Sequence, residues 1–587
     1  MTRLTAVTAS AGAGKTTRIV GDIAAEVALR PPEEIVATTF TIKAAGELVE
    51  RARARLFGDG RTEAAARLLG ARFGTVNAVC GQIVSEFALD LGRSPSTAVI
   101  GAGNEALIFS MAADRAIAAH APVLNTLADR FGYNDPRPPS GEGPDWRRTV
   151  RRIVDLARSN GLDADGVRSS ADRSIEAFRS LPPSAAPDGA ALDAALNTAL
   201  AAAMTTRPAE LSAKAKKPME AIRAAHERVS RGETLSWPAW ARLAKAECAP
   251  TKDGPAFATA VTALAAAAGR HADHPRLRKE IETFIRSTFD CAAEALVAYQ
   301  DWKAQRGLLD FTDQEALALE VLRDPKMAAR LRERISRVFV DEFQDSSPLQ
   351  LAVFTALAGL VEESTWVGDP KQAIYGFRGA DTDLTQAAFA GAAAGGDPAD
   401  VLARSWRSRQ GIIDLSNALF TPAFERMGLP AASHAFAGTN RSETGFDRAA
   451  LGWWTLTGKV DEQAQALAAQ IVACLEDGGK WLVGDRSGDH RPLAIGDIAV
   501  LCRTNTDVAR YARALSRAGL PVAVERSGLA RTPHVELVLA GCRWVADASD
   551  RLALAELARF FSDDPGSDAW LAAAADADPE AALSRSE

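Results

Sequence analysis

The stretch ASAGAGKTT, residues 9–17, constrains the fold more than any other part of the chain. It follows a short apolar run at Leu4–Thr8 and precedes a segment in which Ile19, Val20 and Ile23 fall on one helical face. A strand, a glycine-rich turn and a helix in this order aim backbone N–H groups and a helix N-terminus at one spot, which is how proteins cradle phosphate. The stretch therefore predicts a parallel α/β sheet with a phosphate site at its edge.

The residue types in this stretch predict separate roles. Lys15 would reach the β- and γ-phosphates of a nucleotide, and the Thr16 hydroxyl would bind Mg²⁺. Gly12 and Gly14 would let the backbone approach the phosphates closely. Ala9 stands where the usual GxxxxGK[ST] pattern has glycine, so the motif is a variant. The predicted nucleotide-binding residues are Ala9, Ser10, Ala11, Gly12, Ala13, Gly14, Lys15, Thr16 and Thr17.

A second stretch, VFVDEFQD at 338–345, supplies carboxylates at the end of a predicted buried strand. Asp341 would hold Mg²⁺ through water at the carboxyl edge of the sheet. Glu342 follows it and would orient and deprotonate an attacking water. Two acids after a strand can also be the start of an ordinary loop. Together with the phosphate loop, they predict hydrolysis of a nucleoside triphosphate, with Thr16 and Asp341 as the metal-binding residues.

Patterns along the rest of the chain predict several domains, as 587 residues require. Strand-like runs at 34–40 and 73–79 alternate with helical segments near the N-terminus, and Ala-rich helical segments dominate from about 96 to 300. Strand-like runs return at 337–340 and 365–368. A second alternating block follows, with predicted strands near 401–404, 451–457, 498–503 and 521–525, helices around 411–420, 460–476 and 506–518, and a helical C-terminal part.

Composition excludes some classes of protein. The net charge of −7 argues against a chain that coats nucleic acid through its overall charge, although it leaves room for a local basic channel. The six cysteines show no CxxC spacing, which argues against a disulfide framework or a zinc site. No run of about 18 apolar residues is present, so no membrane span is expected. The N-terminus lacks a secretory pattern, and a cytoplasmic location is predicted.

Several further motifs occur in a fixed order: TFTIKAAGELVER (39–51), LDFTDQ (309–314), DEFQD (341–345), VGDPKQAIYGFRGAD (367–381) and LARSWRS (402–408). Together with ASAGAGKT, this series resembles the superfamily 1 DNA helicases of the UvrD/Rep/RecB/AddA group. About 250 residues separate GTVNAVCGQIVSEF (74–87) from DEFQD, which is more similar to RecB and AddA than to the smaller UvrD type.

The resemblance implies an α/β fold of tandem RecA-like P-loop lobes with parallel sheets, a large helical insertion in the first lobe and an incomplete second lobe. The implied boundaries are 1–95 and 296–395 for the two parts of the first lobe, 96–295 for the insertion, 396–528 for the first part of the second lobe and 529–587 for the start of a second insertion.

The resemblance also implies roles for individual residues. Gln372 would sense the γ-phosphate, Arg407 would stabilise charge in the transition state, and Trp406 would stack on adenine. Lys15, Asp341, Glu342, Gln372 and Arg407 are thus the predicted catalytic set. The predicted DNA-binding residues are Phe40, Lys43, Tyr375, Phe377 and Arg378, whose aromatic rings would stack on bases and whose charges would contact phosphates; a core aromatic is the alternative for Phe40 and Tyr375.

Three family features have no match in the sequence. No glutamine-containing segment precedes the phosphate loop, Asn77 stands in place of a histidine, and the last two motifs, including the TRAR-type arginine finger, are not found. An N-terminal fragment of a longer protein is therefore expected. Completion of the lobe by another chain and a degenerate motor are the alternatives. The basic segment 145–158 would track duplex DNA or form a solvated face.

The expected function is an ATP- and Mg²⁺-dependent helicase that moves 3′→5′ on single-stranded DNA and acts at single-strand/double-strand junctions. It would work in repair or recombination, and its partner would be a nuclease or a second helicase. A nucleotide- and DNA-binding regulatory subunit with little turnover is the first alternative. The motor of an anti-phage defence system is the second.

Overall fold

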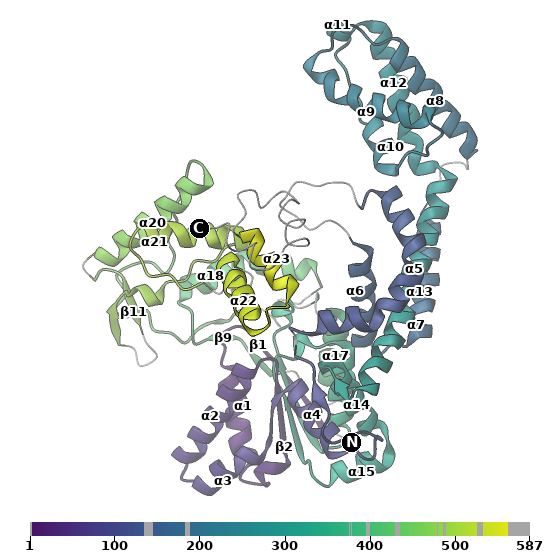
Figure 1. The fold of residues 1–587 in the computed structure, drawn as a ribbon. Coiled ribbons are helices and arrows are strands. Elements are labelled where there is room, and N and C mark those ends of the chain that lie inside the picture. The colour runs from purple at the N-terminus through teal and green to yellow at the C-terminus, as the bar shows by residue number, and fades with distance from the viewer. Residues whose placement is uncertain are drawn as a thin grey trace. The chain divides into compact units, whose positions relative to one another are not determined.

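The computed structural model describes residues 3–101, 103–133, 145–181, 188–374, 376, 379–394, 400–428, 435–477, 479–484, 489–524 and 532–560 (Figure 1). The chain forms two compact units, Met1–Arg441 and Ser442–Glu587.

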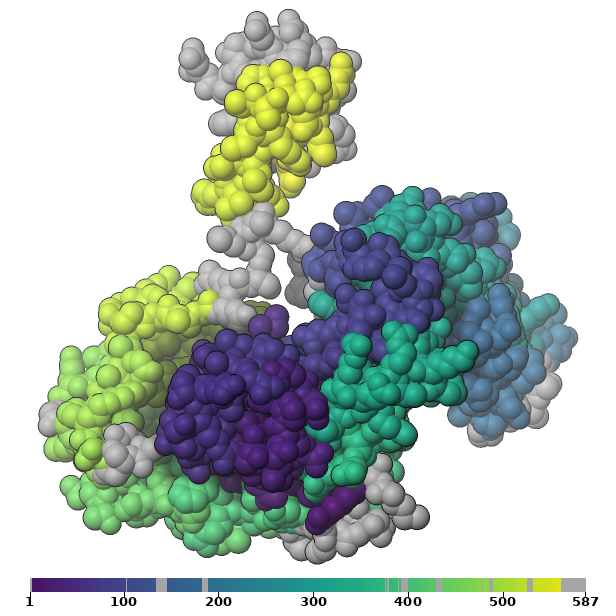
Figure 2. Space-filling model, turned by 90° about the horizontal axis from the view of Figure 1, so that it is seen from below, coloured from purple at the N-terminus to yellow at the C-terminus, as the bar shows by residue number. Residues whose placement is uncertain are grey.

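The first unit contains a six-stranded sheet in the order β3-β2-β6-β7-β1-β8. All of its strand pairs are parallel. The strands are β1 (Arg3–Ala9), β2 (Ile35–Thr39), β3 (Arg72–Thr75), β6 (Arg337–Val340), β7 (Glu363–Gly368) and β8 (Asp400–Leu402). The pairing of β2 with β6 joins parts of the chain that the helical insertion separates, and Figure 2 shows the purple N-terminal residues lying against teal residues from the middle of the chain. The predicted α/β class is confirmed, with one sheet consistent with a RecA-like lobe.

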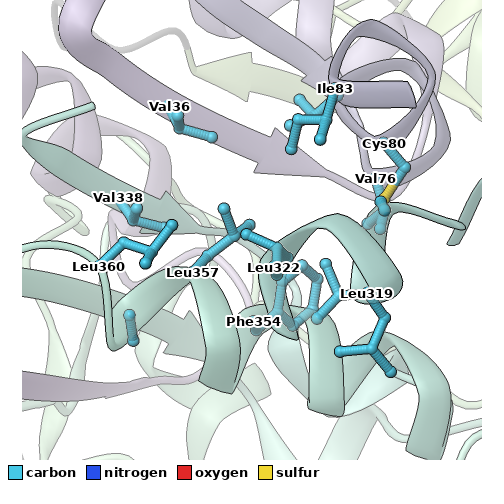
Figure 3. Packing of buried hydrophobic residues seen from close by; sticks show 14 of the residues in the cluster. Val36, Val76, Cys80, Ile83, Leu319, Leu322, Val338, Phe354, Leu357 and Leu360 are labelled. Carbon is cyan, nitrogen blue, oxygen red and sulfur yellow. The ribbon is translucent and has the colours of Figure 1, made fainter. Parts of the chain in front are cut away.

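Helices cover both faces of the sheet because successive side chains of each strand point to opposite faces. Ala37, Phe339 and Val367 pack under α1 (Lys15–Glu26) and α2 (Ile42–Gly58). Their neighbours along the same strands, among them Val36, Val338 and Trp366, pack in a second core with α4 (Val76–Glu86), α14 (Phe311–Arg323) and α16 (Pro348–Ala358) (Figure 3). The burial of both faces fixes the sheet rigidly, so it positions the loops at its edge.

The structure corrects two sequence predictions in this sheet. The strand predicted at 73–79 ends at Thr75, because the Thr75 side chain accepts a hydrogen bond from the Ala78 backbone N–H and caps α4. The strand predicted near 401–404 as the first of a second block is β8, and it pairs with β1 at the edge of the first sheet. This strand therefore belongs to the first compact unit, which runs to Arg441.

The insertion consists of helices around two further cores. The first core joins α5 (Glu105–Phe131), α6 (Trp146–Ser159), α7 (Ala164–Ser180) and α13 (Pro275–Gln305). The second joins α8 (Gly189–Thr205), α9 (Ala213–Ser230), α10 (Trp237–Leu243) and α12 (Pro255–Gly269). Among the described residues, α5 alone is long and apolar enough to cross a membrane by length and composition, but its Phe109, Ala113 and Leu124 pack in the first of these cores.

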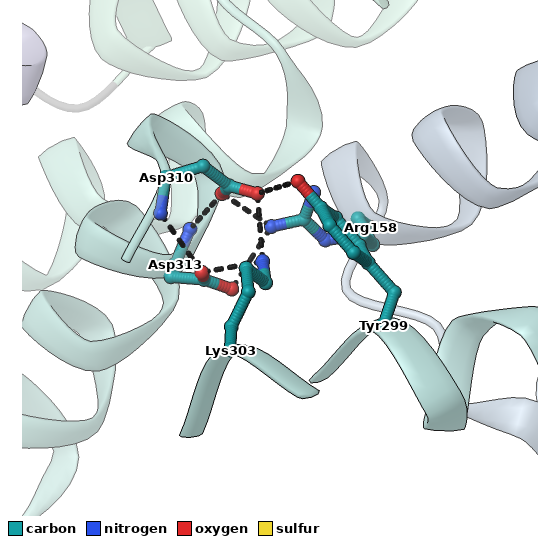
Figure 4. A network of polar contacts seen from close by, with 5 residues as sticks. All are labelled: Arg158, Tyr299, Lys303, Asp310 and Asp313. Carbon is teal, nitrogen blue, oxygen red and sulfur yellow. Dashed lines mark hydrogen bonds and ion pairs between the residues drawn. The ribbon is translucent and has the colours of Figure 1, made fainter. Parts of the chain in front are cut away.

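A buried ionic network joins the insertion to the sheet lobe (Figure 4). Arg158 of α6 lies 2.5 Å from Asp310 and 2.9 Å from Asp313, the capping-box pair at the start of α14. Lys303 and Tyr299 of α13 also donate to Asp310, at 2.7 and 2.9 Å. Burial alone would raise the pKa of Asp310, but the charges of Arg158 and Lys303 hold it below its usual value.

Replacing Arg158 with methionine should therefore destabilise the first unit. The change keeps most of the side-chain volume but leaves Asp310 and Asp313 with one cation between them, at an expected cost of about 3–5 kcal/mol. Urea unfolding followed by circular dichroism measures the effect. Arg152→Met, at an exposed position of the same helix, is the control and should change stability by less than about 0.5 kcal/mol. Equal effects of the two variants would contradict the assigned role.

Glu315 of α14 should make stability depend on pH. Burial raises its pKa to about 7, although Gln350 donates a hydrogen bond of 2.7 Å to its carboxylate. Because the folded pKa exceeds the unfolded value of 4.5, its contribution is fully present below pH 4.5 and is lost as pH rises through about 7. Glu315→Gln should therefore stabilise the protein at pH 8, by on the order of 2 kcal/mol, and much less at pH 5. Urea midpoints at both pH values test this, with exposed Glu320→Gln as control.

The second unit contains a small core around α20 (Val460–Glu476) and α21 (Asn505–Arg517). The helices predicted at 460–476 and 506–518 are therefore present. Its described strands are β11 (Leu482–Gly484) and β12 (His490–Pro492), which pair antiparallel. The segments 451–457, 498–503 and 521–524, predicted as strands, form no strand among the described residues. α22 (Pro533–Ala546) and α23 (Arg551–Phe560) follow.

Candidate nucleotide site

The candidate site lies where the parallel strands of the first unit end. Because these strands all run in one direction, their carboxyl ends meet at a single edge, which is where open α/β sheets bind ligands. The phosphate loop follows β1, Asp341 and Glu342 follow β6, Gln372 follows β7, and Trp406 and Arg407 follow β8 and the short β9 (Arg404–Ser405). The fold thus brings predicted residues from four distant stretches to one edge.

The phosphate loop turns sharply from β1 into α1. Gly12 and Gly14 have φ angles of +73° and +97°, and Gly14 is the N-cap of α1. The Ala13 backbone N–H donates to Ser10 O at 3.0 Å, which closes the loop on itself. Lys15 is the first residue of α1, so its side chain leaves the helix at the end where backbone N–H groups have no helical acceptor. This geometry fits a bound anion.

The segment after β8 lies directly on this loop. The Trp406 backbone N–H donates to Gly12 O at 2.8 Å, and a Cβ at Gly14 would lie 3.7 Å from the Trp406 ring. A Cβ at Gly12 would lie only 2.7 Å from Arg407 Cβ. The buried Ser405 hydroxyl holds the turn by accepting from the Arg407 and Ser408 backbone N–H groups. Two predicted residues distant in sequence thus contact the phosphate loop.

Gly12→Ala should disturb this contact. The new Cβ would meet the Arg407 stem, and the left-handed φ is one that alanine rarely adopts, so we expect a loss of about 1–3 kcal/mol of stability. Gly46→Ala is the matched control, because a Cβ there has open space within α2 and should leave stability equal or raise it by up to about 1 kcal/mol. Thermal unfolding of both variants gives the comparison, and a Gly12 variant as stable as the wild type would refute the packing argument.

Lys15 and Glu342 form the central ion pair of the site. Lys15 Nζ lies 2.6 Å from Glu342 Oε2, across 327 residues of sequence. Glu342 has φ +53°, and it is the one described non-glycine residue with a positive φ. This left-handed backbone turns its carboxylate away from the strand direction and towards the phosphate loop. Such strain in a non-glycine residue is typical of functional sites.

Gln344 links Glu342 to the loop after β7, and the sequence prediction missed it. Its side chain is 2% exposed, and its Nε2 donates to Glu342 Oε2 at 2.8 Å. Its Oε1 accepts from the Asp369 backbone N–H at 2.8 Å, and the Asp369 carboxylate in turn accepts from Gln372 Nε2 at 2.6 Å. The predicted catalytic residues Glu342 and Gln372 are therefore connected through two residues. The available signal was the glutamine within DEFQD itself.

The carboxylates after β6 are crowded. Burial raises the pKa of Asp341 to about 6, and that of Asp345 to about 6, with the Glu342 charge adding to both. Two buried side-chain oxygens, Asp345 Oδ1 and Thr38 Oγ1, have no hydrogen-bond partner among the described residues. Thr38 lies next to Asp341, because its backbone carbonyl accepts a hydrogen bond from the Asp341 backbone N–H. Oxygen donors under mutual repulsion fit a hard divalent cation, and Asp341 with Thr16 could hold Mg²⁺ beside the phosphate loop.

The predicted DNA-binding residues are only partly described. Phe40 is half-buried and Lys43 exposed, and both follow β2 at the same sheet edge, where the neighbouring Ile42 is 84% exposed. Tyr375, Phe377 and Arg378 lie outside the described residues. Ile374, just after Gln372, is 69% exposed. Exposed apolar side chains thus lie next to both predicted DNA-binding stretches.

Comparison with known proteins identifies relatives of this chain. The family model for the UvrD/REP helicase N-terminal domain matches residues 1–389. An ATP-dependent helicase/nuclease subunit from Levilactobacillus brevis is 30% identical over 41% of this chain and 22% of that protein. RecB of the Escherichia coli RecBCD enzyme is 31% identical over 37% of this chain and 20% of its own length. The matched part is thus about a fifth of each of these two relatives.

One relative matches over a longer range. The ATP-dependent helicase/nuclease subunit of the same name from Latilactobacillus sakei is 24% identical over 91% of this chain and 68% of its own length. A match of this extent includes most of the helical insertion. With the family model covering about two thirds of the residues, the chain belongs to the UvrD/REP helicase family, whose members are ATP-dependent DNA helicases.

Proposed function

We propose that this chain is the ATP-hydrolysing motor of a DNA helicase that moves along single-stranded DNA. The observation that carries the proposal is the Lys15–Glu342 pair at 2.6 Å, because it brings the phosphate-loop lysine and a strand-end glutamate together at one sheet edge. Trp406 and Arg407 on the phosphate loop add an aromatic ring and a cation to the same place. Membership in the UvrD/REP family supplies the substrate class.

Each residue of the site would have a separate role in ATP hydrolysis. Lys15 and the N–H groups of the loop would bind the phosphates, and bound Mg²⁺ would neutralise phosphate charge. Glu342 would accept a proton from the attacking water, and Gln344 would keep its carboxylate aimed at that water. Gln372 would contact the terminal phosphate, while the Arg407 guanidinium would stabilise charge that develops there. The Trp406 ring would stack on the adenine.

DNA binding would use the neighbouring loops of the same edge. Phe40, Tyr375 and Phe377 would stack on bases, and Lys43 and Arg378 would contact phosphates. Stacking tolerates any sequence, which suits a motor on single-stranded DNA and at its junctions with duplex. Gln372 and Phe377 are five residues apart in the sequence. Loss of the γ-phosphate that Gln372 contacts would therefore change how Phe377 stacks on a base. From the resemblance of its motifs, the proposal also includes movement in the 3′→5′ direction and a role in repair or recombination. Because the relatives are named as subunits of helicase/nuclease enzymes, it further includes a nuclease or helicase partner.

The test is ATP hydrolysis measured with and without single-stranded DNA. DNA should raise the rate, Gln372→Ala should lower it with or without DNA, and Phe377→Ala should mainly lower the stimulation. Hydrolysis that is indifferent to DNA would overturn the motor proposal. Binding of nucleotide and DNA with negligible turnover would favour a regulatory subunit instead.

A further inference from the structure

Lys371 carries a further cation into the nucleotide site, beside Lys15 and Arg407, and no assigned role uses it. It lies in the short turn Pro370–Gln372 after β7, immediately before Gln372. Its side chain is only 12% exposed, and its Nζ donates to the hydroxyl of Ser10, the first residue after β1. The same Nζ lies 5.2 Å from the centre of the Phe436 ring, which covers it from another side. A buried lysine that contacts the phosphate loop is therefore part of the site's geometry.

Asp369 is the carboxylate that the structure describes beside Lys371. Nζ lies 3.6 Å from Asp369 Oδ1, compared with 2.6 Å between Lys15 and Glu342. The Asp369 carboxylate is shared, because it also accepts from Gln372 Nε2 and from the Lys371 backbone N–H. Burial lowers the pKa of the Lys371 ammonium, and the charge of Lys15 acts in the same direction. A phosphate bound at the loop would bring an anion that offsets the cost of burying this ammonium group.

The position of Lys371 indicates which phosphate of a nucleotide it would contact. The inner phosphates would lie at the N-terminus of α1, where Gly14 and Lys15 begin the helix. Glu342 and Gln372 would act at the terminal phosphate, and both connect to Asp369 beside Lys371. With the nucleotide bound in this way, Lys371 would lie beside the terminal phosphate, where the bond is broken.

We propose that Lys371 is a second phosphate-binding lysine. When a nucleoside triphosphate binds, its ammonium group breaks the hydrogen bond to the Ser10 hydroxyl and contacts the terminal phosphate instead. The inference rests on the proposed function, since it concerns the same nucleotide. Through Lys371 the turn after β7 distinguishes a triphosphate from a diphosphate. Three of the predicted DNA-binding residues, Tyr375, Phe377 and Arg378, follow Lys371 in the sequence.

The experiment is a fluorescence titration of the protein with mant-ADP and with mant-AMPPNP, a non-hydrolysable triphosphate, in the presence of Mg²⁺. Lys371→Ala should weaken triphosphate binding by about 10- to 100-fold, as expected for loss of a charge-assisted hydrogen bond, and diphosphate binding by less than about threefold. Lys371→Arg should recover most of the triphosphate affinity because it keeps the charge. Lys326→Ala, at an exposed position on α15 (Pro325–Arg332), is the control and should change neither.

Each remaining outcome is decisive. In two outcomes the wild type binds both nucleotides normally: Lys371→Ala lowers both affinities equally, or it lowers neither. Either result would overturn the role of Lys371 and leave the proposed function standing. A wild-type protein that binds neither nucleotide would overturn the proposed function, and the inference with it. Melting temperatures of the variants show whether each is folded, and a folded Lys371→Arg that fails to recover affinity for the triphosphate would also contradict the proposal.

Discussion

Lys15→Ala should abolish hydrolysis and reduce nucleotide affinity by at least about 100-fold. Lys15 is the one residue of the phosphate loop that brings a full positive charge to the phosphates, and charge-assisted bonds to phosphate each contribute about 1.5–3 kcal/mol. The variant also removes the cation that faces Glu342 at 2.6 Å, so the carboxylates of Asp341, Glu342 and Asp345 would be left to repel one another. Their repulsion should hinder the approach of an anionic nucleotide still further.

The measurement combines a titration with mant-AMPPNP and a steady-state assay of phosphate release. Lys326→Ala is the control for loss of a lysine elsewhere, and it should behave as the wild type. Lys15→Arg separates charge from shape: it keeps the charge, but its planar group should fit the narrow loop poorly, so partial binding with little turnover is expected. A Lys15→Ala variant that binds and hydrolyses ATP normally would place the nucleotide elsewhere.

Glu342→Gln should separate turnover from binding. The amide keeps the size of the side chain but cannot accept a proton from water, and loss of a general base typically costs about 10²–10⁴ in rate. Nucleotide affinity should stay the same or rise, because Lys15 would no longer be held by a carboxylate. Single-turnover hydrolysis and the titration described above give the two quantities from one preparation.

The matched control is Glu333→Gln, which neutralises an exposed glutamate after α15 and should alter neither quantity. Equal losses of affinity and rate in Glu342→Gln would show that Glu342 mainly binds the nucleotide or supports the fold. Gln344→Ala offers a further comparison, because it leaves the Glu342 carboxylate present but removes the hydrogen bond that aims it. It should lower the rate less than Glu342→Gln does.

Much of the first lobe could be predicted from local sequence patterns. The apolar runs that became β1, β2, β6 and β7 are buried on both faces of a parallel sheet, and such strands consist of near-continuous apolar and β-branched residues. The phosphate loop was also predictable, since its glycines, lysine and threonine are fixed by the conformation and chemistry that phosphate binding needs. The Asp341 and Glu342 pair followed from its place after such a strand.

Other features depend on contacts between distant residues, which local patterns do not contain. Thr75 could be read as the middle of a β-branched strand, but its hydroxyl caps α4 instead. The run around 401–404 suits a strand in either lobe, and only its pairing with β1 assigns it to the first. Lys371 and Gln344 went unnoticed because their importance lies in their partners, Ser10 and Glu342, and not in their own spacing.

The most direct test of the nucleotide site is a crystal structure of the protein with Mg²⁺ and AMPPNP. We expect the phosphates within the loop of residues 9–17, Lys15 Nζ moved from Glu342 to a phosphate oxygen, and Mg²⁺ beside Thr16 and Asp341. A nucleotide bound at any other place, or a Lys15–Glu342 pair that stays intact with the nucleotide present, would contradict this expectation.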